Sequence, residues 1–266
     1  MSETLLQIEG ISRTYRNLGG MFSGKRYSVA AVKDVSLSVD AGEVVGLVGE
    51  SGSGKSTLAR IVMGLEQPDS GRVLLDGVDV HACRKEQLRQ IRRTVQMVFQ
   101  NPYAALNPLQ RIDAAIVEPL ANFQRLSQKE RETIAAETLE DVGLPARLLH
   151  TYPHQLSGGE RQRVCIARAL SVKPKLLLCD EAVSALDKTI QAQVLKLLHQ
   201  LQQRYGLAIL FISHDLAAVN RLCENLAVMC KGKIVERGGC HKLLTEAAHP
   251  YTQKLLEANC YLEGAA

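Results

Sequence analysis

The chain has 266 residues, of which 46% are hydrophobic and 23% charged, and its 32 basic and 28 acidic side chains leave a net charge of +4. This length suffices for one large domain or two small ones, and the nearly balanced charge, without a long basic run, argues against a nucleic-acid partner. Apolar runs such as Leu207–Ile212 are far shorter than the roughly 20 residues of a membrane helix, and the first residues lack the features of a secretory signal. We therefore expect a globular protein in the cytoplasm, with its seven cysteines reduced.

The first hundred residues alternate between strand patterns and turns. Alternating apolar residues predict strands at Leu5–Ile11 and Val35–Val39, and the glycine-containing stretch 17–28 between them predicts a loop or hairpin tip. The continuous apolar run Val44–Val48 lies between glycines, which predicts a buried central strand, and a helix should follow over residues 54–65. Two shorter strands are expected at 73–75, before a hairpin turn, and at 95–99.

The middle of the chain is predicted to be helical. Ser127 and Glu130 have the spacing of a capping box, which predicts the start of a helix over residues 129–142, and a second helix should follow Gly158.

Beyond this block, strand patterns return. A strand at 176–179, a helix at 190–204 and a strand at 208–212 make a β-α-β unit, so the two strands should be parallel. Closing strands are expected at 226–229 and 233–235.

The sequence from Gly49 to Thr57 contains the spacing GxxxxGK[ST] between the predicted central strand and a predicted helix. This context is typical of a loop that wraps nucleotide phosphates, because glycines let backbone N–H groups turn inward and the helix N-terminus attracts anions. Lys55 should reach the β- and γ-phosphates, and the Ser56 hydroxyl should bind Mg²⁺.

Asp180 and Glu181 end the apolar strand 176–179, at the edge where open parallel sheets bind ligands. We expect Asp180 to hold Mg²⁺ and Glu181 to orient or deprotonate the attacking water. His214 ends the next strand and could bond a γ-phosphate oxygen, while Gln100, after the strand at 95–99, is a candidate ligand of Mg²⁺ and water.

Ser157, Gly158 and Gly159 open a helix and so form a second anion-binding N-terminus. Because the first loop already holds the phosphates of the bound nucleotide, this second site is explained if it contacts a nucleotide on another molecule. The expected assembly is a head-to-tail dimer with two ATP molecules at its interface.

Taken in order, these motifs resemble the ATP-binding cassette (ABC) transporter ATPases along nearly the whole chain. The resemblance implies an α/β P-loop NTPase (RecA-like) core at 1–99 and 170–240 with an antiparallel β subdomain, a helical subdomain at 100–169 that carries the signature group, and a tail at 241–266. It also implies that residues 184–187 join two active sites, that Tyr15 stacks on adenine, and that ATP and Mg²⁺ are the cofactors. One departure is Glu160, where the family most often has Gln. The residues expected at the nucleotide are Tyr15, Gly49, Gly52, Ser53, Gly54, Lys55, Ser56, Thr57, Ser157, Gly158 and Gly159.

Within that family the chain resembles the peptide and nickel importer ATPases, on the segments 152–155, 191–194 and 249–253. Such importers pair two non-identical ATPases with two membrane permeases and an external solute-binding protein, so we expect a peripheral subunit at the cytoplasmic face of the membrane. Ala182 and Val183, where peptide members commonly have proline, and the absence of a cysteine-rich C-terminal extension make nickel or a metal chelate our first expectation. Peptide import and a soluble, non-transport ABC ATPase remain the alternatives.

Overall fold

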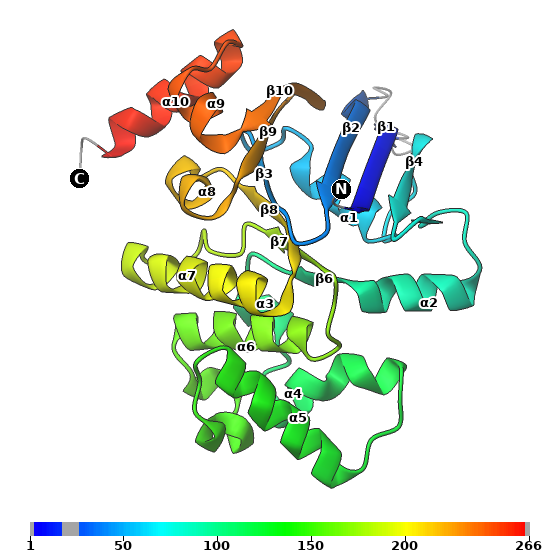
Figure 1. Cartoon of the computed structure of the whole chain (residues 1–266), viewed down its shortest axis with the longest axis vertical. Coiled ribbons are helices and arrows are strands. Elements are labelled where there is room, and N and C mark those ends of the chain that lie inside the picture. Colours follow the sequence, from blue (N-terminus) through cyan, green and yellow to red (C-terminus); the bar gives the residue numbers. More distant parts are fainter. Residues whose placement is uncertain (1–2, 18–26, 264–266) are drawn as a thin grey trace, which may run out of the picture.

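The computed structural model describes residues 3–17 and 27–263 and contains two β-sheets that lie side by side (Figure 1). The antiparallel sheet has the order β2-β1-β4-β5, and the larger sheet has the order β10-β9-β3-β8-β7-β6. The first comprises β1 (Thr4–Asn17), β2 (Tyr27–Asp40), β4 (Ser70–Leu75) and β5 (Val78–Asp79). The second comprises β3 (Val44–Val48), β6 (Val95–Val98), β7 (Leu176–Asp180), β8 (Ala208–Ser213), β9 (Asn225–Cys230) and β10 (Lys233–Gly239).

Strands β3, β6, β7, β8 and β9 are parallel, and only β10 joins the larger sheet antiparallel. The carboxyl ends of β3, β7 and β8 therefore meet at one edge of the sheet, where Gly49, Glu181 and His214 follow them. This arrangement explains how residues that are far apart in the sequence become neighbours.

Both faces of the larger sheet are buried, which explains why its central strands have continuous apolar sequences. On β3, Val45 and Leu47 face one core, which the antiparallel sheet and α1 close. Val44 and Val48 face a second core, shared with the helices on the opposite side.

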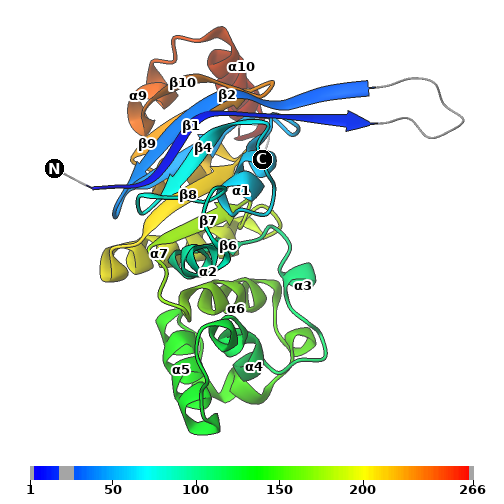
Figure 2. The same cartoon turned by 90° about the vertical axis from the view of Figure 1, so that its right-hand side faces the viewer.

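The helices from the middle of the chain gather at the lower end in Figures 1 and 2. The long pair β1 and β2 lies near the other end (Figure 2). The α-helices are α1 (Lys55–Val62), α2 (Lys85–Thr94), α3 (Pro102–Ala105), α4 (Ile112–Val117), α5 (Gln128–Asp141), α6 (Gly158–Leu170), α7 (Lys188–Tyr205), α8 (Leu216–Leu222), α9 (Cys240–Thr245) and α10 (Pro250–Glu263). Short 3₁₀ helices span Glu118–Asn122, Ala146–His150 and Pro153–Gln155. Within residues 3–17 and 27–263, no helix combines the length and apolar character needed to cross a bilayer.

Most of the predicted elements are confirmed, with ends that shift by at most four residues apart from β1 and β2. The fold class is confirmed, and so is the capping box, since Ser127 Oγ accepts the Glu130 N–H and the Glu130 carboxylate accepts the Ser127 N–H. Strands β1 and β2 were expected to be shorter; each has 14 residues, because pairing with each other extends both. Most of the loop expected at 17–28 lies outside the described residues.

Three parts of the chain hold helices that the sequence patterns did not indicate: α2, α8 and the expected tail. Helix α2 buries only Ile91, with half-buried Leu88 beside it, so its sequence offers just two apolar side chains from which a helical spacing could be recognised. The expected tail contains α9 and α10, whose buried Cys240, Leu243 and Leu255 pack into the core shared with the helices.

Candidate active site

The phosphate-binding loop connects the end of β3 to the start of α1 through glycines that no other residue could replace without strain. Gly49 and Gly54 have φ values of +154° and +109°, and an added Cβ would lie 2.1 Å from the Met229 carbonyl oxygen and 2.2 Å from that of Ala31. Gly52 has a φ of +79° but faces open space. The loop is therefore packed tightly against β9 and β2 on one side, and its Gly52 corner is open on the other.

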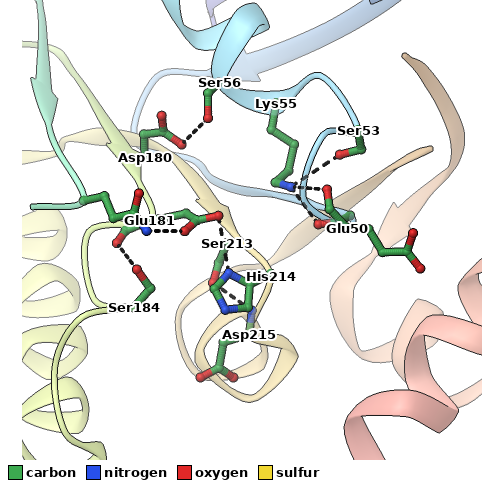
Figure 3. Close-up of polar contacts among 12 residues, drawn as sticks. Glu50, Ser53, Lys55, Ser56, Asp180, Glu181, Ser184, Ser213, His214 and Asp215 are labelled. Atoms are coloured by element: carbon green, nitrogen blue, oxygen red, sulfur yellow. Dashed lines mark hydrogen bonds and ion pairs between the residues drawn. The ribbon is translucent and has the colours of Figure 1, made fainter. Parts of the chain in front are cut away.

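Lys55 is the first residue of α1 and is only 4% exposed. Its Nζ donates to the carbonyl oxygens of Gly49 at 2.7 Å and Glu50 at 2.9 Å, and lies 3.3 Å from Ser53 Oγ (Figure 3). Burial lowers the pKa of Lys55, while the nearby carboxylates of Glu181, Asp180 and Glu50 oppose that shift. The ammonium group thus lies inside the loop, within reach of an anion that the loop would enclose.

Asp180, at the end of β7, lies opposite the start of α1. Ser56 Oγ donates to Asp180 Oδ1 at 3.2 Å (Figure 3). Burial raises the pKa of Asp180 and its neighbour Glu181 adds to the shift, whereas the Ser56 hydrogen bond, Lys55 and Arg60 oppose it.

The donor set at this point fits Mg²⁺, since a hydroxyl and a carboxylate are hard oxygen ligands. Ser56 and Asp180 would hold the ion, with Gln100 across a cavity of about 600 Å³ that all three line. The ion would neutralise phosphate charge.

Glu181 lies between the other two residues that were expected to be catalytic. Gln100 Nε2 donates to Glu181 Oε2 at 2.8 Å, and His214 Nδ1 lies 3.3 Å from Glu181 Oε1 (Figure 3). The Glu181 backbone has a φ of +50°, and its N–H donates to the Ile212 carbonyl of β8 at 2.9 Å. Because the neighbouring strand fixes this unusual backbone, the carboxylate is held in one place at the sheet edge.

His214 is positioned by a network that sequence reasoning did not find. The next residue, Asp215, caps α8 by accepting the Ala218 N–H, and it also accepts Gln191 Nε2 at 2.7 Å and Lys188 Nζ at 3.2 Å. Gln191 is 7% exposed and lies in the first turns of α7, directly after the loop 184–187. A buried amide that meets a helix-capping Asp could be found only once α7 and α8 were placed side by side.

Tyr15 of β1 lies beside α1. Its hydroxyl donates to Glu66 Oε2 at 2.8 Å and lies 3.4 Å from Thr57 Oγ1, and the Arg13 guanidinium is 5.3 Å from the ring centre. The ring is partly exposed, so its place next to the end of the phosphate-binding loop is compatible with contact to a base.

The signature group is separate from these residues. Ser157 caps α6 by accepting the Glu160 N–H, and the Glu160 carboxylate accepts both the N–H and the hydroxyl of Ser157. Glu160, at the position where the family most often has Gln, thus completes a capping box with Ser157. Within the described ranges, no hydrogen bond or ion pair joins Ser157, Gly158 or Gly159 to the phosphate-binding loop or to Glu181.

A larger cavity, of about 980 Å³, lies at the opposite end of the strands. Its lining includes Lys175 and Leu207, which directly precede β7 and β8, and none of the expected site residues. Because Asp180, which lines the cavity of about 600 Å³, lies at the carboxyl end of β7, the two cavities are distinct.

Comparison with known proteins agrees with this geometry. A family model described as "ABC transporter" matches residues 32–184. The chain is 48% identical to the probable peptide ABC transporter ATP-binding protein y4tS of Sinorhizobium fredii, over 97% of this chain and 73% of that protein. It is 45% identical to the di/tripeptide transport ATP-binding protein DppF of Pseudomonas aeruginosa, over 96% of this chain and 79% of that one.

Among solved structures, the ATP-binding cassette MJ0796, a dimer in a post-hydrolysis state with ADP and phosphate, superposes with a TM-score of 0.78. It is 30% identical over 89% of this chain and 99% of its own. The chain therefore belongs to the ABC transporter ATP-binding family, and it is an ABC-type ATPase.

Proposed function

We propose that this ATPase energises the import of peptides across a membrane. The observation that carries the catalytic part is the Glu181 carboxylate, which Gln100 and His214 contact from two sides and which follows the Ser56–Asp180 pair. In this arrangement Lys55 and the loop would hold the phosphates, and Ser56, Asp180 and Gln100 would hold Mg²⁺. Glu181 and His214 would orient the attacking water.

The peptide assignment is supported by the relatives, since both curated proteins described above are named for peptide or di/tripeptide transport. Neither is named for nickel, so our first expectation, nickel or a metal chelate, has no support from them, and the peptide alternative fits better. Ala182 and Val183, directly after Glu181, are each 1% exposed and form no surface that a solute could contact.

We propose a transporter complex around this chain. Its partners would be a second, non-identical ATPase in head-to-tail contact, two integral membrane permeases and an external solute-binding protein. The chain itself would be peripheral, at the cytoplasmic face of the membrane. The surface next to Gln100 supports the permease contact, because Phe99, Tyr103 and Leu109 are 43%, 65% and 86% exposed.

A strain that lacks this gene tests the solute. Growth on di- or oligopeptides as the required amino-acid source should fail, radioactive nickel accumulation should stay normal, and the intact gene should restore growth. If nickel accumulation were lost while growth on peptides stayed normal, the nickel assignment would be supported instead.

A further inference from the structure

The segment 249–253, which helped to place the chain in its family, lies beside the phosphate-binding loop. The Glu50 N–H donates to Tyr251 Oη at 3.0 Å, although the two residues are 201 positions apart in the sequence. In Figure 3 the ribbon of α10 passes next to Glu50. A cavity of about 510 Å³ separates the rest of this segment from the loop and is lined by Glu50, Gly52, Lys231, His249, Tyr251 and Lys254.

The contact bears on Lys55 through one peptide group. The Glu50 N–H meets Tyr251, and the Glu50 carbonyl oxygen accepts Lys55 Nζ at 2.9 Å. The Glu50 N–H and the Gly49 carbonyl belong to the same peptide group, and this carbonyl accepts Lys55 Nζ at 2.7 Å. The Glu50 carbonyl belongs to the next peptide group along the chain. Because a peptide plane is rigid, fixing the Glu50 N–H also fixes the direction of the Gly49 carbonyl toward Lys55.

Tyr251 is itself held in place. Glu236 of β10 accepts the N–H groups of Ala248 at 2.8 Å and His249 at 3.2 Å, and His249 Nδ1 accepts the Tyr251 N–H at 3.1 Å. Thr252, the next residue, is 3% exposed. The hydroxyl of Tyr251 is therefore presented to the loop from a fixed support.

The environment of that hydroxyl favours the neutral phenol. Burial raises the pKa of Tyr251, the Glu50 N–H opposes this shift, and Glu50 and Cys230 add to it. The uncharged hydroxyl accepts the Glu50 N–H without adding a negative charge next to the phosphate site.

We propose that Tyr251 is a positioning residue for the phosphate-binding loop: it holds the Gly49–Glu50 peptide in the orientation that aligns Lys55 with the nucleotide phosphates. The proposal concerns the ATPase itself and does not depend on which solute is transported. It also gives a physical role to the segment 249–253, which the proposed chemistry otherwise leaves unused.

The test is the Tyr251→Phe substitution in the full chain, which removes the hydroxyl and keeps the ring. The dissociation constants of ATP and ADP should rise about two- to tenfold, the change expected for one hydrogen bond of ordinary strength. The KM for ATP should rise by the same factor with kcat nearly unchanged. Tyr205→Phe is the matched control, because Tyr205 donates its hydroxyl to Asp141 far from the loop; its nucleotide affinities should equal those of the parent.

Thermal unfolding separates positioning from a general structural role. Without nucleotide, Tyr251→Phe and Tyr205→Phe should be destabilised to a similar small extent, since each loses one hydrogen bond, but the stabilisation by added ADP should shrink only in Tyr251→Phe. Unchanged affinity in Tyr251→Phe would overturn the proposal. So would equal losses of affinity in both variants, or a stabilisation by ADP in Tyr251→Phe as large as in the parent.

Discussion

The phosphate-binding loop and the start of α6 are both glycine-rich helix N-termini, but they differ in what surrounds them inside this chain. Around the loop, Asp180, Glu181, Gln100 and His214 form a connected set of side chains. Ser157 instead forms hydrogen bonds with Glu160 of its own helix.

The glycines of the two motifs also differ in purpose. Gly49 and Gly54 are needed because backbone carbonyls lie where a Cβ would go, whereas a Cβ on Gly158 would find its nearest neighbour, Leu186 Cδ2, at 4.0 Å. A side chain at Gly158 would therefore meet no steric obstacle inside this chain. The comparison supports a chain that contains two separate halves of an active site: a catalytic half at the sheet edge and a signature half at α6.

The largest expected effect tests the catalytic half. Replacing Glu181 with Gln keeps the side-chain shape but removes the base, so turnover at the site that Glu181 serves should fall about 10²- to 10⁴-fold while ATP affinity stays near that of the parent. Phosphate release and a nucleotide titration measure the two quantities. Lys55→Ala is the contrasting variant, since it should weaken nucleotide binding itself. Parent-like hydrolysis by Glu181→Gln would show that another group activates the water.

The next effect tests the signature half. Gly158 is the first residue of α6, where an aspartate is favourable for the helix, so Gly158→Asp should fold as the parent does. Its charge would face the phosphates of a nucleotide on the partner, and ATP-driven association with the partner ATPase should weaken about tenfold or more.

Two controls belong to this measurement. Nucleotide binding to the isolated Gly158→Asp chain should be unchanged, because the chain's own phosphate loop is intact. Gly158→Ala should associate nearly as the parent does. If the aspartate variant associated normally, the start of α6 would not face a nucleotide.

The sequence predicted the parts of the site that depend on local backbone geometry. The loop 49–57 needs glycines and an adjacent strand and helix, all of which appear within a few residues. The acidic pair and His214 were predicted because parallel strands end at the same edge. Of the fold, the buried strands were the most predictable elements, since their apolar runs are continuous.

Contacts between distant segments could not be predicted in this way. Gln191 and Asp215 meet across α7 and α8, and Tyr251 meets Glu50 across 201 positions. Each of these residues has an ordinary polar side chain whose role depends on the final packing. Helix α2 was missed for a related reason, because it covers the protein with polar side chains and buries only Ile91.

The first turn of α7 contacts both halves inside the chain. A Cβ on Gly159 would lie 2.6 Å from Ile190 Cγ2, so α6 packs directly on α7 there, and the neighbouring Gln191 holds Asp215 next to His214. Gln191→Leu tests this link. It keeps the buried volume similar and removes the hydrogen bond to a carboxylate, so the free energy of unfolding should fall by about 1.5–3 kcal/mol at neutral pH.

The pH dependence of that loss identifies its cause. Burial alone would raise the pKa of Asp215, but the bonds from Gln191, the Ala218 N–H and Lys188 lower it below 3.8. A lowered folded-state pKa means that the stabilisation is complete above the unfolded pKa and is lost as pH falls through the folded one. In urea unfolding, the difference between the parent and Gln191→Leu should therefore shrink as the pH is lowered from 7 toward the acid range. A difference that stayed constant with pH would mean that the leucine acts through packing and that Asp215 is not part of the link between the two halves.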